Sequence, residues 1–160
     1  MAVADKELTD QIQTSAEAME ATVLPCARVV HTSKDAPRTA EMEPLPECVA
    51  AQPIAAKSPA QWAYERLILY IKNFEGQLDN EHEVAMGFTA GGAGVLKIEG
   101  IGYFDPDIVT FYGQDDGGAR TQLIQHVSQL SVMLRAMPKA PEEEEPRRIG
   151  FRLAADLEKK

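Results

Sequence analysis

Residues 58–76 read SPAQWAYERLILYIKNFEG, and this stretch decides how the centre of the chain folds. Ser58 is a residue type that caps helix N-termini, and Pro59 suits the first helical position because its missing N–H needs no partner there. Large apolar side chains then recur at helical spacing with charged residues between them, and Gly76 offers a C-terminal cap. The stretch predicts a helix over residues 59–74.

The residues that follow this helix have the patterns of short strands. Within residues 83–89, Val84, Met86 and Phe88 fall on one side, which is the period of a half-buried strand. Residues 95–104 form a longer strand, in which Gly100 and Gly102 predict a bend or a bulge. Residues 108–112 are β-branched and aromatic, as in another short strand. Turn residues separate these segments, so we expect antiparallel neighbours.

Residues 121–137 fit two interpretations. Their apolar residues fit helical spacing, whereas from Leu130 to Leu134 they also alternate as in a strand, and periodicity does not separate the two. We favour two strands that meet at residues 126–129, because the strand at 108–112 needs a pairing partner after its hairpin loop.

These elements predict an α+β fold, with an N-terminal helix packed on a small, strongly bent antiparallel β-sheet. We expect the globular domain over residues 58–139. Residues 1–57 contain no Trp, Tyr or Phe and bury little surface, so we expect a largely disordered acidic and proline-containing tail. We expect residues 140–160 to be an acidic linker and charged tail, with residues 147–153 as a candidate edge strand.

One part of the N-terminal tail has a pattern of its own. Its apolar residues fall near helical spacing with acidic residues between them. These apolar residues are Leu8, Ile12, Met19 and Val23. The pattern fits a weak or partner-induced helix over residues 4–23, and it also fits a fraying acidic segment.

Composition limits the classes of function. Among 160 residues, 25 are acidic and 16 basic, and the net charge of −9 opposes non-specific nucleic-acid binding, so we expect no DNA partner. The sequence has no long apolar run and no signal-peptide pattern, so we expect a cytoplasmic protein without membrane contact. Its cysteines are Cys26 and Cys48, which predict no disulfide framework; we also expect no metal site and no cofactor.

Four short motifs carry a family resemblance: residues 62–67 (WAYERL), 102–104 with 112–113, 122–131 (QLIQHVSQLS) and 146–151 (PRRIGF). With these motifs the chain resembles an uncharacterised bacterial family of unknown function, DUF6173. The resemblance implies a bacterial protein and brings no activity with it.

A second resemblance is to Sm-like proteins, including the bacterial RNA chaperone Hfq. Residues 94–100, followed by 103–105 and 108–109, are similar to the first Sm motif, and residues 124–128 to the second. The resemblance implies a helix followed by five strongly bent antiparallel strands, and it leaves an Sm-like or SH3-like barrel open.

The RNA site of Hfq-type proteins is not carried over with this resemblance. There, a Gln-Phe pair after the first-motif Asp stacks a base, and a Lys before the second-motif His contacts the nucleic acid. Here Pro106 and Asp107 replace the pair and Gln125 replaces the Lys. A stacking ring and a cation are therefore lost, and RNA binding is disfavoured.

The candidate ligand-binding residues are His126, Gln125, Ser128, Tyr103 and Asp105. His126 has an ordinary pKa near neutrality, which suits ligand contact or acid–base chemistry. A histidine at a tight strand connection more often hydrogen-bonds the backbone, and we favour that role. The sequence places no Ser, Cys or carboxylate as its partner, so no catalytic triad is assembled.

The favoured function is a non-enzymatic binding or adaptor module in a bacterial cytoplasm, with a protein partner or self-association through sheet edges. The first alternative is an Sm-like RNA-binding regulator. The second is a small enzyme that uses His126.

Overall fold

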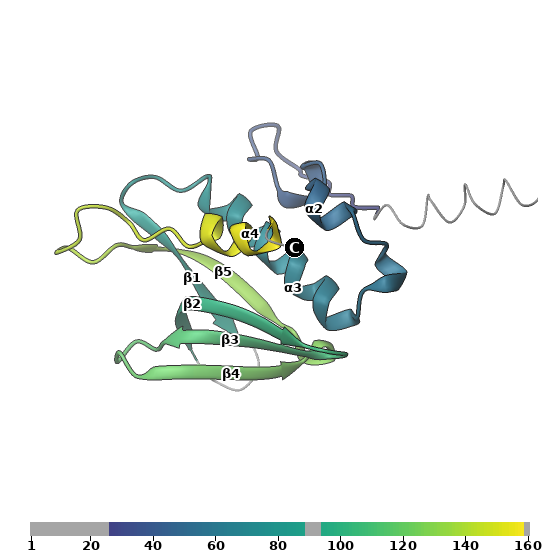
Figure 1. Cartoon of the computed structure of the whole chain (residues 1–160). Coiled ribbons are helices and arrows are strands. Elements are labelled where there is room, and N and C mark those ends of the chain that lie inside the picture. The colour runs from purple at the N-terminus through teal and green to yellow at the C-terminus, as the bar shows by residue number, and fades with distance from the viewer. Residues whose placement is uncertain (1–25, 89–93, 159–160) are drawn as a thin grey trace, which may run out of the picture.

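The computed structural model describes residues 26–88 and 94–158 of the chain, as helices over one face of a five-stranded sheet (Figure 1). The strands are β1 (His82–Phe88), β2 (Val95–Phe104), β3 (Ile108–Gln114), β4 (Arg120–His126) and β5 (Val132–Pro138). The longer helices are α3 (Pro59–Glu75) and α4 (Gly150–Glu158), and the short ones are η1 (Ala40–Met42), α2 (Glu47–Ala50), η2 (Ile54–Ala56) and η3 (Val127–Gln129). The predicted α+β class is confirmed.

The sheet is an open antiparallel meander of four strands, and the last strand pairs beside the first. The strand order is β4-β3-β2-β1-β5, so the first four strands pair in sequence and β5 returns to the outer side of β1. Among the residues described, β4 and β5 are the two edges of an open sheet. The interpretation of residues 121–137 as two strands is confirmed, and η3 forms their connection.

Strand β2 has a bulge at the first of its glycines. Its first residues pair with β1 and the remainder pairs with β3, with a bulge between Ile98 and Gly100. A Cβ at Gly102 would lie 2.8 Å from Oγ1 of Thr110, closer than such atoms approach, so a larger side chain is excluded unless Thr110 shifts. Of the predicted bend or bulge, the structure shows the bulge.

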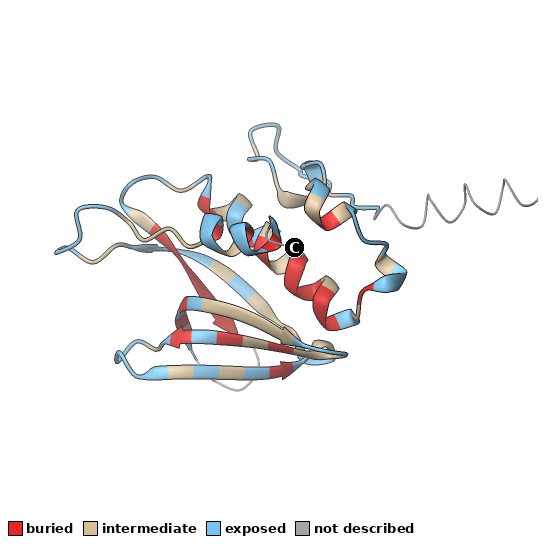
Figure 2. Cartoon of the chain, in the orientation of Figure 1, coloured by how far each residue is buried: buried red, intermediate tan, exposed pale blue. Residues whose placement is uncertain are grey.

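Helix α3 is the central element of the core, and Figure 2 shows buried residues along it and on the strands it faces. The Ser58 hydroxyl accepts a hydrogen bond from Gln61 N–H at 3.0 Å, which is the predicted N-cap. One side of α3, with Ile71, packs on the sheet against Met86, Ile98 and Phe111. Its other side forms a second cluster with α2 and α4, made of Val49, Tyr64, Ile68, Ala154 and Leu157.

The edge strand expected at residues 147–153 is wrong. Helix α4 begins there instead, at Gly150. The carboxylate of Glu75 accepts hydrogen bonds from the N–H groups of Ile149 and Gly150, each at 2.8 Å. These are donors that a helix N-terminus otherwise leaves unpaired. Ala154 and Leu157, three residues apart, then both face the second cluster. These tertiary contacts favour a helix over the expected edge strand.

The described part of the expected tail, residues 26–57, also departs from expectation. Val49 is fully buried in the second cluster. The Lys57 ammonium lies 2.8 Å from Oε1 of Glu65, with both side chains almost fully buried, and donates to the Val49 carbonyl at 2.5 Å. The packed region therefore starts before the predicted boundary at Ser58. Residues 1–25 lie outside the described part of the chain.

Candidate functional site

His126 forms a small polar cluster with Asp107 and Ser128 at the η3 connection. Its Nδ1 accepts a hydrogen bond from the Ser128 N–H at 3.1 Å and lies 2.8 Å from Ser128 Oγ. Because Nδ1 accepts, the ring proton sits on Nε2, which lies 3.0 Å from Oδ2 of Asp107. The predicted hydrogen bond between the ring and the backbone is confirmed, with the backbone N–H as the donor.

The order Asp107, His126, Ser128 resembles a catalytic triad only in its residue types. The Ser128 hydroxyl and its own N–H approach the same ring nitrogen, and Gln129 Oε1 accepts from the His126 N–H at 3.0 Å, which completes a capping box. The Val127 N–H also donates to the Asp107 carbonyl at 2.8 Å. The cluster therefore fastens η3 to the turn between β2 and β3.

Asp107 is the member of this cluster that was absent from the candidate ligand-binding residues; it was named as a replacement in the Sm-like motif. The signal that places it is the strand register, since Ile108 pairs with His126 across β3 and β4. The residue before Ile108 then lies beside the residues that follow His126. A correct register for the β3–β4 hairpin would therefore have predicted that Asp107 lies beside His126.

The other predicted site residues lie elsewhere. Tyr103 and Gln125 both face Val109 in the register, on the inner side of the sheet. The Tyr103 ring packs on Tyr64 with centroids 5.0 Å apart, and buried Gln125 Oε1 has no hydrogen-bond partner among the described residues. Asp105 accepts a hydrogen bond from Ser58 Oγ at the start of α3. The five residues thus do not form one site.

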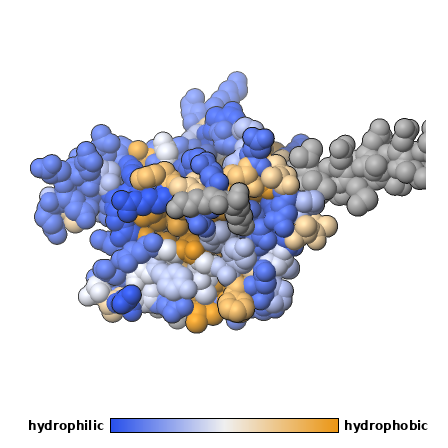
Figure 3. Space-filling view, in the orientation of Figure 1, coloured by the Kyte–Doolittle hydropathy of each residue, from blue (hydrophilic) through white to orange (hydrophobic). Residues whose placement is uncertain are grey.

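The outer face of β2, β3 and β4 is apolar and open to solvent. Phe104 is 77% exposed, Ile124 61% and Tyr112 42%, and the register places all three on this face. Figure 3 shows apolar atoms reaching the surface at the end of the molecule where β4 lies. The Tyr112 side chain lies beside Gly100 and Gly102, where an added Cβ would be 3.6 and 3.7 Å from its ring atoms.

The features that usually protect a sheet edge are limited here to Arg120 at the start of β4 and to Arg135 and Pro138 in the second half of β5. From Thr121 to Leu134, which covers nearly all of β4 and the first half of β5, the sequence has no Lys, Arg, Asp or Glu. Ile124 on β4 and Met133 on β5 are both substantially exposed. Charged side chains and prolines are the common means of preventing edge-to-edge pairing. These edges are therefore suited to pair with another strand.

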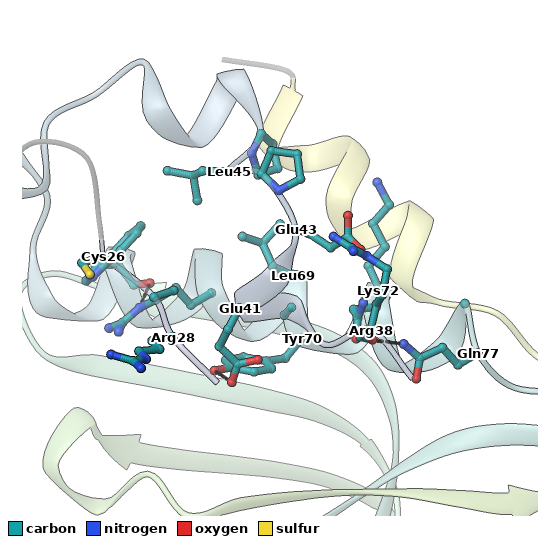
Figure 4. A pocket seen from close by; sticks show the side chains of 18 of the residues that line it. Cys26, Arg28, Arg38, Glu41, Glu43, Leu45, Leu69, Tyr70, Lys72 and Gln77 are labelled. Atoms are coloured by element: carbon teal, nitrogen blue, oxygen red, sulfur yellow. Dashed lines mark hydrogen bonds and ion pairs between the residues drawn. The ribbon is translucent and has the colours of Figure 1, made fainter. Parts of the chain in front are cut away.

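A separate groove of about 1210 Å³ lies between residues 26–46 and the outward side of α3 (Figure 4). The Tyr70 hydroxyl donates to Glu41 at 2.9 Å, and Arg38 pairs with Glu43 at 2.8 Å. Burial, and then the hydrogen bond to Glu41, raises the pKa of Tyr70. The Glu41 pKa is lowered, first by a backbone hydrogen bond.

The groove wall on α3 includes the single tryptophan of the chain. The Arg66 guanidinium lies 4.6 Å from the centre of the Trp62 ring, and the Lys57 ammonium lies 4.8 Å from it. Two cations on one indole are a favourable arrangement for the ring and hold Trp62 in place. Arg28 and Lys72, which also line the groove, make no ion pair within the described residues.

The described residues hold no cluster of three or more His, Cys, Asp or Glu side chains arranged to bind a metal ion. Within the same residues, no helix combines the length and the apolar character that a membrane crossing needs.

The chain matches a family model described as "Family of unknown function (DUF6173)" over residues 52–152. No curated protein and no solved structure matches the chain. The matched region contains α3, the whole sheet and the start of α4, whereas residues 26–46 of the groove lie before it. Since the match covers more than half of the chain, the protein belongs to the DUF6173 family.

Proposed function

We propose that this protein is a non-enzymatic protein-binding module of a bacterial cytoplasm, which self-associates when β4 of one copy pairs with β5 of the next. The observation that carries the proposal is the pair of uncharged strand segments at opposite edges of one open sheet. The β-edges of a sheet offer unpaired N–H and C=O groups, which another strand satisfies by extending the sheet.

A second copy of the chain is the occupant that fits these edges. Strands β4 and β5 each have seven residues, so one edge matches the other in length. The contact is head-to-tail, because two different edges meet. Exposed Ile124 beside one edge and Met133 beside the other add apolar contact to the backbone hydrogen bonds.

The polar cluster at His126 supports a binding module over a small enzyme. The Nδ1 atom that a general base would use already accepts from the Ser128 backbone within its own turn. An RNA-binding regulator is the other alternative, and the net charge of −9 and Asp107 both oppose it. We expect no sub-micromolar binding of uridine-rich or adenine-rich RNA at physiological salt.

Sedimentation velocity over a range of protein concentrations tests the proposal. We expect concentration-dependent oligomers of the wild type. Ile124→Lys and Met133→Lys each put a charge beside one edge, and each should raise the concentration needed for association at least about tenfold, or about 1.4 kcal/mol. Val30→Lys is the matched control, since Val30 is 77% exposed and belongs to no strand of the sheet.

Mixing the two variants distinguishes head-to-tail pairing from other contacts. Ile124→Lys keeps a free β5 edge and Met133→Lys keeps a free β4 edge, so the mixture should form one-to-one dimers that neither variant forms alone. A wild type that is monomeric at all concentrations contradicts the proposal. So does association that both lysine variants leave unchanged.

A further inference from the structure

The groove on α3 has an apolar floor and a cationic rim. Leu45 from one wall and Leu69 from the other line it, and Figure 4 shows both near its middle. Its walls carry four basic side chains, namely Arg28, Arg38, Arg66 and Lys72, against two acidic ones, Glu41 and Glu43. In a chain of net charge −9, this excess of positive charge is local. The groove therefore suits an amphipathic segment with an acidic face.

The first 25 residues of the chain have that composition. They contain five acidic residues against one basic residue. On a helix of 3.6 residues per turn, Leu8, Ile12, Met19 and Val23 fall within one narrow stripe, and Asp10, Glu17 and Glu20 fall on other sides. The charge of this segment complements the groove, and its apolar stripe complements the floor.

The lengths of the segment and the groove also agree. From Leu8 to Val23 a helix advances about 22 Å, at about 1.5 Å per residue. The wall formed by α3 and the two residues after it runs from Trp62 to Gln77, which is the same number of residues and about the same length.

The segment joins the described chain at the groove itself. Cys26 lines the groove, and in Figure 4 it lies at the end opposite Gln77. Only Leu24 and Pro25 separate Val23 from Cys26, and a proline disfavours helix at the residue before it. A tether this short gives an effective concentration in the millimolar range, without the cost of bringing two molecules together.

We propose that residues 8–23 of this chain bind the groove as a helix antiparallel to α3, with the apolar stripe on Leu45 and Leu69 and with the acidic side chains toward Arg28 and Lys72. The outward side of α3 is then covered by a built-in occupant. The inference does not depend on the proposed pairing of sheet edges, because the groove and the edges involve different residues.

Hydrogen exchange of the full-length protein, measured by mass spectrometry at low concentration, tests this placement. Ile12→Asp with Met19→Asp disrupts the apolar stripe. Thr14→Asp with Ala21→Asp adds the same charge on the opposite side of the helix and is the matched control. We expect amides of residues 8–23 to exchange at least about tenfold faster in the first variant than in the wild type or the control.

Two further measurements address the groove side. Arg28→Glu should reduce the protection of residues 8–23 more than Lys34→Glu does, because Lys34 is exposed and outside the groove. Acrylamide quenching of Trp62 fluorescence should increase when the apolar stripe is disrupted and stay unchanged in the control.

Three results would overturn the proposal. The first is exchange of residues 8–23 at the rate of an unstructured peptide in the wild type. The second is protection that persists when Ile12 and Met19 are replaced. The third is protection that appears only as protein concentration rises, since the occupant would then be the N-terminal segment of a second copy.

Discussion

Glu75 Oε1 accepts a hydrogen bond at 2.8 Å from the N–H of Gly150, which is 75 residues away in the sequence. This contact joins the end of α3 to the start of α4, and Gly150 belongs to the last motif of the family resemblance, residues 146–151. A Cβ at position 150 would lie 2.7 Å from Glu75 Oε1 and 2.9 Å from the Cα of Lys72.

We therefore expect Gly150→Ala to lower the free energy of unfolding by about 1–3 kcal/mol, because overpacking displaces either the carboxylate or the backbone of α3. Urea denaturation measures the change. Gly117→Ala is the control, since the nearest atom to a Cβ there is at 3.5 Å and belongs to a turn side chain. Equal stability of the two variants would show that the approach at Gly150 relaxes without cost.

Replacement of His126 by Ala removes the acceptor for the Ser128 N–H and the partner of Asp107. The ring and the carboxylate are both partly exposed, so solvent weakens the contact between them, and we expect a loss of about 1 kcal/mol, from the backbone hydrogen bond. Thermal unfolding beside Gln122→Ala, an exposed position on the same strand, checks this. An unchanged melting temperature would leave His126 free for a ligand.

The buried pair of Lys57 and Glu65 allows a test of how residues 45–57 join the domain. Lys57→Met leaves the Glu65 carboxylate buried without a counter-charge, and we expect a loss of about 3–5 kcal/mol. The double variant Lys57→Met with Glu65→Leu should recover most of that loss, because both charges are then absent. A single variant as stable as wild type would mean that residues 45–57 do not pack on α3 in solution.

Stability should fall at alkaline pH because of Tyr64. Burial first, and then the hydrogen bond to the Asp156 carboxylate, raises the pKa of the Tyr64 hydroxyl above its ordinary value. The folded state holds this proton more tightly than the unfolded state, so the contribution is fully present below pH about 10 and is lost as pH rises further. Tyr64→Phe should flatten the dependence of unfolding free energy on pH above that value, and an equally steep dependence would assign it to other groups.

The main helix and the strands of this fold were predictable because the sequence signals for them are local. Ser58 caps α3 by contacting a residue three positions on, and Gly100 lies at the bulge of β2. The strand predicted at 83–89 is present as β1, but it is buried from Glu83 to Phe88 and not half-buried, because both of its faces are covered. For residues 121–137, the choice of two strands over a helix depended on the need of β3 for a pairing partner. That argument uses a neighbouring element in addition to the local pattern.

The start of α4 and the packing of Val49 depend on distant residues and were therefore missed. Nothing within residues 147–153 encodes that Glu75 will satisfy the first N–H groups of a helix there. Val49 lies in a proline-containing stretch without aromatics, and it is buried only because α3 and α4 provide the other sides of its cluster. The candidate ligand-binding residues do not lie together for a simpler reason. Gln125 and His126 are adjacent in a strand, so their side chains face opposite sides of the sheet.

The return of β5 to β1 has a consequence for the order in which the chain folds. Strands β1 to β4 can pair as each is synthesised, but β5 pairs with β1 only after the whole meander and η3 have been made. Such a non-local pairing is slow to form, because a long loop must close before its contacts compensate for the lost entropy. During synthesis the unpaired edge of the growing sheet is therefore β1, whose residues are the most buried of any strand, and release of the chain past Pro138 is what covers them.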